Sequence, residues 1–452
     1  MGAGVLGTGA PGTGARDAGA AAPTPAPPTG FGLTDGVWHA DAVPLPAIAE
    51  AVGTPCYVYS AGVVRRQYRR LAAAFAGAPT RIHYSIKANS NLALLRLLRA
   101  EGASANVVSG GELYRCLQAG YGPGDVIFGG VGKTARELGE ALDARVRFVN
   151  VESEGEILLL DAVARERGVV APASLRVNPG VSVETPHHYI KTGEEGHKFG
   201  IPFDEVQGAA DLARSLPNVR LVGLDMHIGS QLAAYDPYGA ALLRVLGLLT
   251  RLRANGVDTI EYLDVGGGLS VRYADEEPAD VERVARGIID ATRGLGLTLV
   301  VEPGRFLVAE AGVLLARVLY RKRSGGKEVV VTDAGMNDLI RPSHYGAYHA
   351  ITAAQPHRGR LTLDVVGPIC ESGDFLALDR ETDDVRPGDL VVVHTAGAYG
   401  YVMASNYNSR PRPAEVVVDG GRWSVATARE SYADLVRHEA ADAPVRDGRD
   451  RA

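Results

Sequence analysis

Lys87 is the residue of this sequence with the clearest chemical use, because it ends the short apolar strand within Tyr84-Ser85-Ile86-Lys87-Ala88-Asn89. A helical run over residues 91–101 follows at once, which places Lys87 at the carboxyl end of a strand, where open and closed α/β sheets both carry their chemistry. Apolar walls would disfavour its ammonium form, so that it could react as a neutral amine with an aldehyde. The hexapeptide alone is equally typical of a surface lysine at a strand end.

No other lysine ends an apolar strand. Lys133 stands in Gly132-Lys133-Thr134, which looks like the end of a nucleotide-binding loop, but Ile127 occupies the position where that loop requires its first glycine. This match therefore fails. The lysines of the chain are Lys87, Lys133, Lys191, Lys198, Lys322 and Lys327.

Three later strand ends carry polar residues that would share a rim with Lys87 in a barrel. They are Met226-His227-Ile228-Gly229-Ser230-Gln231 after the sixth strand, Asp264-Val265-Gly266-Gly267-Gly268-Leu269 after the seventh and Glu302-Pro303-Gly304-Arg305 after the eighth. A triple glycine alone is typical of a tight turn, and a single histidine is more often a core residue. Loops after the last two barrel strands, however, often bind phosphate, and glycines let backbone N–H groups approach it closely.

Together these groups match the needs of pyridoxal phosphate. A lysine forms the Schiff base, a carboxylate keeps the pyridine nitrogen protonated so that the ring is an electron sink, and a flat side chain holds the ring's face. The sequence therefore predicts a pyridoxal phosphate site on one rim of an α/β fold.

The elements that must position these residues alternate between short apolar strands and amphipathic helices. Helical stretches such as residues 134–143 and 237–254 separate the strands. Eight strands are predicted, over residues 82–86, 105–108, 125–128, 147–151, 174–177, 221–228, 260–265 and 297–301. Their number and spacing favour a closed (β/α)8 barrel, with a doubly wound sheet as the alternative.

After Glu310 the pattern changes to short β-rich runs separated by Gly, Pro and Asp, which predicts a second, mainly antiparallel β domain. These runs cover residues 313–320, 328–331, 361–366, 390–394, 414–418 and 422–425. Five segments are predicted: a disordered tail (1–30), a strand segment joining the β domain (31–59), the barrel (60–309), the β domain (310–437) and a frayed tail (438–452).

Composition excludes several classes of function. The chain has 452 residues, of which 46% are hydrophobic and 22% charged, and its net charge of −6 argues against nucleic-acid binding. No apolar run is long enough to span a membrane. Cys56, Cys116 and Cys370 are too few and too scattered for a disulfide framework or a zinc site, which suits a reducing cytoplasm and predicts no metal.

The motifs, in their order along the chain, resemble those of diaminopimelate decarboxylases, and the resemblance covers about residues 54–432. They are residues 84–89 (YSIKAN), 107–113 (VVSGGEL), 227–231 (HIGSQ), 264–269 (DVGGGL), 302–305 (EPGR), 333–342 (DAGMNDLIRP), 367–374 (GPICESGD), 397–400 (GAYG) and 406–416 (NYNSRPRPAEV). The resemblance implies a cytoplasmic enzyme that decarboxylates meso-2,6-diaminopimelate to L-lysine and CO2, the last step of lysine biosynthesis.

It also implies a role for each matching residue. The catalytic group comprises Lys87 as the Schiff-base lysine, His227 stacked on the ring, Glu302 at the pyridine nitrogen and Cys370 as the proton donor after CO2 leaves. The other cofactor-binding residues are Ser230, Gly266, Gly267, Gly268, Gly304, Arg305 and Tyr399. The substrate-binding residues are Arg305, Arg341, Tyr345, Glu371 and Tyr399. Cys370 and Glu371 would reach into the partner subunit's site, so a homodimer is implied.

The residue chemistry agrees, since an amino-acid head at the far end of a substrate needs a planar cation and an anion, which Arg341 and Glu371 can supply.

Three positions depart from the family's pattern: Asn106 replaces an aspartate, Phe128 to Lys133 lacks an asparagine, and Asp225-Met226 precedes His227. Two alternatives follow. One is a decarboxylase of ornithine, arginine or a specialised amino acid, and the other is a cofactor-binding regulator without catalysis, which would have lost Lys87 or Cys370.

Overall fold

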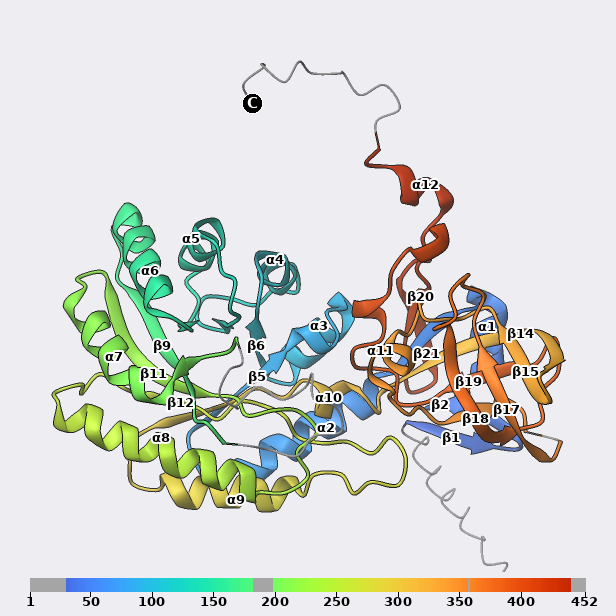
Figure 1. Cartoon of the computed structure of the whole chain (residues 1–452), viewed down its shortest axis with the longest axis horizontal. Coiled ribbons are helices and arrows are strands. Elements are labelled where there is room, and N and C mark those ends of the chain that lie inside the picture. The colour runs from blue at the N-terminus through green and yellow to red at the C-terminus, as the bar shows by residue number, and fades with distance from the viewer. Residues whose placement is uncertain (1–29, 182–197, 357, 440–452) are drawn as a thin grey trace, which may run out of the picture.

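The computed structural model describes residues 30–181, 198–356 and 358–439. The predicted tails, apart from a few residues next to the folded part, lie outside these ranges. Figure 1 shows a barrel of strands and helices on one side and a β domain on the other, joined where α3 and α10 approach the second domain.

Eight parallel strands form the closed barrel. Each strand pairs with the next, and β13 pairs with β5 to close the ring. The strands are β5 (Thr80–Ser85), β6 (Ser104–Val107), β7 (Val126–Phe128), β8 (Val149–Val151), β9 (Ala171–Asn178), β11 (Val219–Met226), β12 (Tyr262–Asp264) and β13 (Thr298–Val301). The two-residue strand β10 (Ile201–Pro202) pairs only with β9. The prediction of a (β/α)8 barrel is confirmed, and the doubly wound sheet is excluded.

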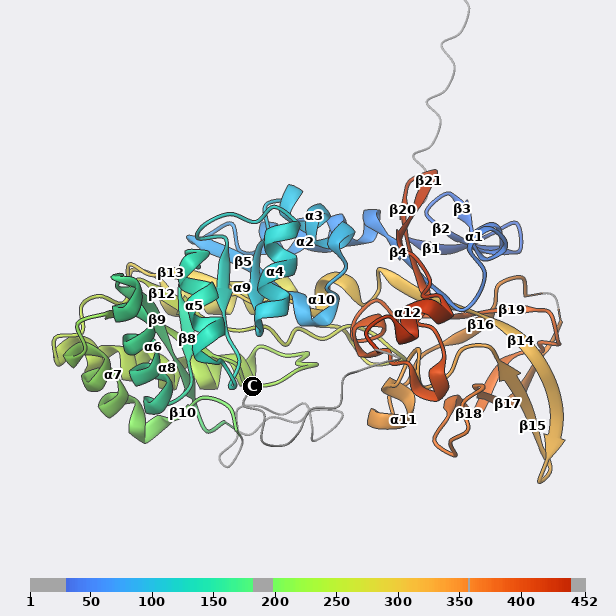
Figure 2. The ribbon, with the colours of Figure 1, turned by 90° about the horizontal axis from the view of Figure 1, so that it is seen from above.

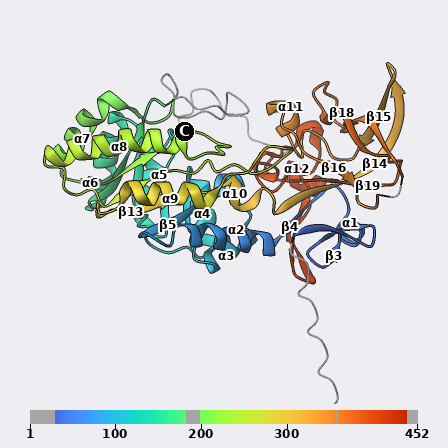
Figure 3. The same ribbon diagram turned by 90° about the horizontal axis from the view of Figure 1, so that it is seen from below.

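Helices cover the outside of the barrel. Many begin at a side chain that accepts a backbone N–H of the first turn, as Asn91, Ser109, Thr134 and Ser153 do. The helices are α2 (Ala61–Ala74), α3 (Leu92–Ala100), α4 (Gly110–Gln118), α5 (Ala135–Asp143), α6 (Glu154–Arg167), α7 (Val206–Ser215), α8 (Asp236–Ala254) and α9 (Val281–Thr292). Figure 2 shows α4, α5 and α6 in succession, and Figure 3 shows α8 beside α9.

Short α10 (Arg305–Val308) leads into the β domain, which is mostly antiparallel. Its strands are β14 (Gly312–Ser324), β15 (Lys327–Thr332), β16 (Ile351–Ala353), β17 (Arg360–Val366), β18 (Phe375–Asp383), β19 (Leu390–Val393), β20 (Ala414–Asp419) and β21 (Arg422–Thr427). Two short helices, α11 (Arg341–Tyr345) and α12 (Tyr432–Val436), accompany them. Strands β16 and β18 were not predicted, and β18 is rich in charged side chains.

The segment before the barrel contains both strands and a helix. Strands β1 (Phe31–Thr34), β2 (Val37–Ala40) and β3 (Val43–Pro44) form a small sheet, and α1 (Leu45–Val52) follows. Predicting residues 31–59 as a strand segment was therefore wrong over α1, where the buried Leu45, Ile48 and Ala49 have helical spacing. Strand β4 (Cys56–Ser60) is entirely buried and lies between β14 and β20.

Candidate active site

Lys87 lies just beyond the end of β5, in the 3₁₀ turn Ile86–Ala88. Its side chain lines a cavity of about 530 Å³ between the barrel rim and the β domain. Contrary to the expectation of a desolvated amine, the residue is exposed to this cavity. Lys133, by contrast, is buried in an ion pair with Glu156, with Nζ 2.5 Å from the carboxylate.

Both domains hold the turn that carries Lys87. On the barrel side, the N–H of Ser85 donates to the carbonyl of Pro303 at 2.9 Å. On the other side, the N–H of Tyr399 donates to the carbonyl of Ala88 at 2.8 Å, and the Asn89 side chain donates to the carbonyl of Gly397 at 3.0 Å. The position of the lysine therefore depends on the contact between the domains.

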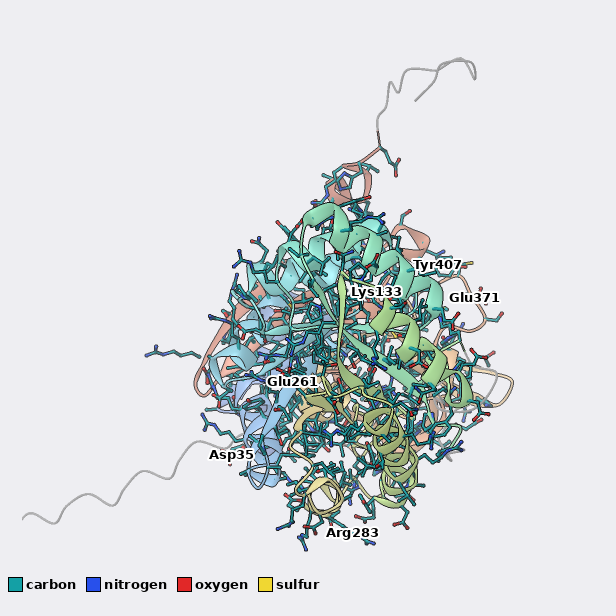
Figure 4. All side chains as sticks on the ribbon, turned by 90° about the vertical axis from the view of Figure 1, so that its left-hand side faces the viewer. Asp35, Lys133, Glu261, Arg283, Glu371 and Tyr407 are labelled. Carbon is teal, nitrogen blue, oxygen red and sulfur yellow. The ribbon has the colours of Figure 1, made fainter. Side chains whose placement is uncertain are left out.

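The cavity brings together seven of the predicted site residues. They are Lys87, His227, Ser230, Arg305, Arg341, Tyr345 and Tyr399. Glu302 is buried and, like the glycines after β12 and β13, does not line the cavity, whereas Cys370 and Glu371 are exposed outside it. In Figure 4 the labelled Glu371 lies at the edge of the molecule, near Tyr407, and the backbone N–H of Cys370 donates to Asn408 Oδ1 at 2.7 Å.

His227 follows β11 and is held as a neutral ring. Burial, with Lys87 as the next cause, lowers the pKa of His227 well below its ordinary value. Its Nδ1 accepts the N–H of Gly267 at 3.2 Å, so the ring proton resides on Nε2. An uncharged, fixed imidazole at this place can stack on a flat ring without repelling a cation.

The glycine loop after β12 packs too closely for any side chain. Gly266 and Gly268 have φ of +71° and +97°, and a Cβ at Gly267 would lie 2.1 Å from the carbonyl oxygen of Glu302. The N–H groups of Gly266 and Gly267 donate to Asp264 and His227. Within the described ranges, only the N–H of Gly268 among the three has no acceptor, so this loop supplies chiefly open space for a ligand and one free donor.

Arg305, the first residue of α10, is a buried cation with an unused donor. Its Nη1 donates to Tyr273 Oη at 2.7 Å and its Nη2 to Ser230 Oγ at 3.3 Å, while the ring of Tyr399 lies 4.8 Å from its Cζ. Its Nε is buried without a partner, and no carboxylate of the described residues pairs with it. Such a guanidinium, beside a hydroxyl and a glycine loop, fits a phosphate group.

Arg341, the first residue of α11, is a second buried arginine on the same cavity. Its Nη1 lies 2.9 Å from Nε2 of His349, and its Cζ lies 4.6 Å from the centre of the Tyr273 ring. Burial lowers the pKa of Arg341. Like Arg305, it forms no ion pair with any carboxylate in the described part of the chain.

Carboxyl groups gather behind the cavity, at the ends of β11, β12 and β13. Burial raises the pKa values of Asp225, Asp264 and Glu302, while Lys87 and Arg176 act in the opposite direction on Glu302. Arg176 binds Glu152 at 2.9 Å and lies 3.8 Å from Asp225. Glu302 therefore lies among groups that can exchange or share a proton, which suits a partner for a protonated ring nitrogen.

Several cavity residues were not found from the sequence. Tyr273, Glu276, Tyr348 and Gln231 line the cavity, and His349 lies directly behind Arg341. Of the departures from the family pattern, Asp225 serves as the partner of Arg176, and the buried Oδ1 of Asn106 has no hydrogen-bond partner. Lys133 holds Glu156 and takes no part in the cavity.

Comparison with known proteins identifies the family. Residues 61–309 match the model described as the pyridoxal binding domain of pyridoxal-dependent decarboxylases. The chain is 48% identical to diaminopimelate decarboxylase of Pseudomonas aeruginosa, over 90% of this chain and 98% of the relative. The chain belongs to the diaminopimelate decarboxylase family.

Solved structures of diaminopimelate decarboxylases have the same fold. The enzyme from Helicobacter pylori, complexed with L-lysine, superposes with a TM-score of 0.84 at 39% identity and covers 87% of this chain and 98% of its own. That from M. jannaschii, also in complex with L-lysine, gives 0.86 at 35% identity, over 91% and 98%. The region matched by the family model spans the whole barrel and contains Lys87, His227, Glu302 and Arg305.

Proposed function

We propose that this chain decarboxylates meso-2,6-diaminopimelate to L-lysine and CO2 with pyridoxal phosphate, as the last step of lysine biosynthesis. One observation carries the choice of substrate: the cavity of Lys87 contains two buried arginines, Arg305 and Arg341, without acidic partners in the described residues. One cation suits the cofactor phosphate. The other suits a carboxylate at the far end of a substrate, and neither ornithine nor arginine has a carboxylate at that end.

When bound, pyridoxal phosphate supplies an electron sink for the bond pair left by CO2. Lys87 would hold its aldehyde carbon, and the neutral His227 would stack on its ring. Glu302 would hold a proton at the ring nitrogen, in a buried setting that strengthens this charge-assisted bond. The phosphate would be bound by Ser230, Arg305 and Tyr399, with Gly266, Gly267, Gly268 and Gly304 leaving room for it.

The substrate would be oriented by its distal carboxylate. Arg341 can form a bidentate pair with that group, while Tyr345 and Tyr399 line the remaining space. Two substrate groups need further residues: an anion for the distal ammonium, for which Glu276 lines the chain's own cavity, and a proton donor for the carbon that loses CO2. Glu371 and Cys370 have this chemistry, and both are exposed outside the chain's own cavity.

We therefore propose a homodimer in which Cys370 and Glu371 of each chain complete the partner's site. Mixing inactive Lys87→Ala and Cys370→Ala chains should then restore activity, because each mixed dimer holds one intact site. Random exchange of equal amounts should give about a quarter of wild-type activity, as follows from two-fold symmetry. Activity is measured after subunit exchange has been verified by native mass spectrometry.

The matched control for this experiment mixes Lys87→Ala with Glu302→Ala. Both residues belong to the barrel of one chain, so each of the two sites in a mixed dimer carries one of the two changes, and this mixture should recover no activity. In a second control, the double variant Lys87→Ala/Cys370→Ala is mixed with wild type. If the sites are shared, each site of a mixed dimer carries one of the two changes, so the mixed dimers should be inactive. No recovery in the first mixture would show that Cys370 serves its own chain.

A substrate screen tests the proposed function itself. The purified, cofactor-loaded enzyme should release CO2 from meso-diaminopimelate at least about a hundredfold faster than from ornithine or arginine, because those lack a partner for Arg341. A preference for ornithine or arginine would instead support the related decarboxylase considered from the sequence. No release from any of them would favour the non-catalytic alternative.

The cellular setting is proposed from the cysteines. All three cysteines are unpaired, Cys56 and Cys116 being buried and Cys370 exposed, which supports a reducing compartment such as the cytoplasm. Within the described ranges, none of the helices combines the length and the apolar character needed to cross a bilayer.

A further inference from the structure

His349 has a defined tautomer because both ring nitrogens have partners. Nδ1 lies 2.8 Å from the carbonyl oxygen of His394, which can only accept, so Nδ1 carries the proton. Nε2 then has the free lone pair and accepts from Nη1 of Arg341 at 2.9 Å. Burial, with Arg341 as the next cause, lowers the pKa of His349 to about 3, so the ring is neutral.

The face of the Arg341 guanidinium is also held by an uncharged group. The Tyr273 ring lies 4.6 Å from Arg341 Cζ, and its hydroxyl accepts from Arg305 at 2.7 Å. Tyr273 also meets His349 edge to face, with 5.4 Å between the ring centres. Arg341 is thus fixed from two sides by side chains that leave its positive charge intact.

We propose that His349 is a positioning residue for substrate selection, which holds Arg341 through a neutral acceptor so that its charge stays available for the distal carboxylate of the substrate. A carboxylate at position 349 would hold the arginine equally well but would neutralise it. The imidazole supplies a fixed lone pair without a competing charge. The Tyr273 ring contacts the same guanidinium. This inference rests on the proposed function and names the device that sets its specificity.

The inference predicts an effect that depends on the carboxylate of the ligand. L-Lysine carries it, and 1,5-diaminopentane is the same molecule without it. Replacing His349 with leucine leaves a buried Arg341 donor unpaired and frees the guanidinium to move. Lysine should then bind the cofactor-loaded enzyme about tenfold more weakly, while the binding of 1,5-diaminopentane changes less than about twofold.

The steady-state kinetics of decarboxylation should show the same weakening of substrate binding. The KM for diaminopimelate should rise about tenfold in His349→Leu with kcat within about twofold, because the lost interaction holds the substrate as tightly as the transition state. His349→Gln, which keeps a neutral acceptor, should restore most of the lysine affinity. His349→Glu, which places a carboxylate beside Arg341, should lose at least about tenfold in lysine affinity and leave 1,5-diaminopentane unaffected.

His394→Leu is the matched control. The ring of His394 bonds Thr352 Oγ1 at 2.9 Å and contacts Trp38, and only its backbone carbonyl meets His349. Replacing the imidazole with leucine perturbs the same buried region but keeps the backbone carbonyl, so the affinity for L-lysine and for 1,5-diaminopentane should not change. Calorimetric titration of the loaded enzyme measures both affinities, and the melting temperature reports folding.

Two results would overturn the inference. One is lysine affinity within twofold of wild type in folded His349→Leu or in His349→Glu. The other is an equal loss for lysine and 1,5-diaminopentane, which would reflect general damage. Should His349→Leu not fold, His349→Glu decides alone. The wild-type enzyme is assayed first. If it does not decarboxylate diaminopimelate, the proposed function is refuted, and the variants are not compared.

Discussion

Lys87→Ala is expected to abolish decarboxylation, with a loss of more than about a thousandfold, and to remove the covalent attachment of pyridoxal phosphate. The side chain of Lys87 lines the cavity that also contains Arg305 and Arg341. Its turn is fixed by hydrogen bonds from both domains, which hold the amine at the cavity. Absorbance near the visible edge reports attachment, and borohydride reduction followed by peptide mapping locates it.

Two other lysines serve as controls for this result. Lys133→Ala removes the buried partner of Glu156 and should lower stability without removing the attached cofactor. Lys322→Ala, at an exposed position on β14, should change neither attachment nor activity. Reduction that labels Lys133 or Lys198 in place of Lys87 would contradict the assignment of the site.

Arg341→Gln is expected to lower kcat/KM for diaminopimelate by more than about a hundredfold, since a desolvated charge-assisted pair contributes about 1.5–3 kcal/mol per bond. Arg341→Lys keeps the charge but loses the planar fork, and should cost at least about tenfold. The residue is 6% exposed and has no acidic partner in the described part of the chain, so its charge is available for a ligand. Steady-state CO2 release measures both variants.

The control for Arg341 is an arginine outside the site. Arg360 pairs with Glu381 at the surface of the β domain, and Arg360→Gln should leave kcat/KM unchanged. Turnover of ornithine, which has no distal carboxylate, should start low and change little in all variants. Intact diaminopimelate turnover in Arg341→Gln would show that another group recognises the substrate, while the cofactor chemistry could still hold.

The barrel rim was predictable from the sequence because each strand end there has a local signature. An apolar run of strand length leads directly into Lys87, His227 or Glu302, and parallel strands bring such ends to one edge. The triple glycine was also readable, since only glycine tolerates the backbone angles and close contacts of that loop. The sequence did not indicate that two of its three N–H groups bond within the protein.

The groups around Arg341 could not be predicted in the same way. Tyr273 lies in an irregular loop after β12, and His349 lies between α11 and β16, where no periodic pattern marks a functional position. The contact of Tyr273 with Arg341 depends on how the β domain packs against the barrel, and that of His349 depends on the path of the loop between α11 and β16. Helix α1 was missed for another reason, since short apolar runs fit a helix or a strand about equally well.

The place of β4 has a consequence for how the chain folds during synthesis. This strand leaves the ribosome before any part of the barrel, yet its two neighbours, β14 and β20, follow only after the barrel is complete. At ordinary rates of translation the delay until β20 emerges is on the order of tens of seconds. Until β14 emerges both edges of this buried strand are unpaired, and the edge that meets β20 stays unpaired for the rest of that time, which leaves residues 56–60 open to pairing with other chains.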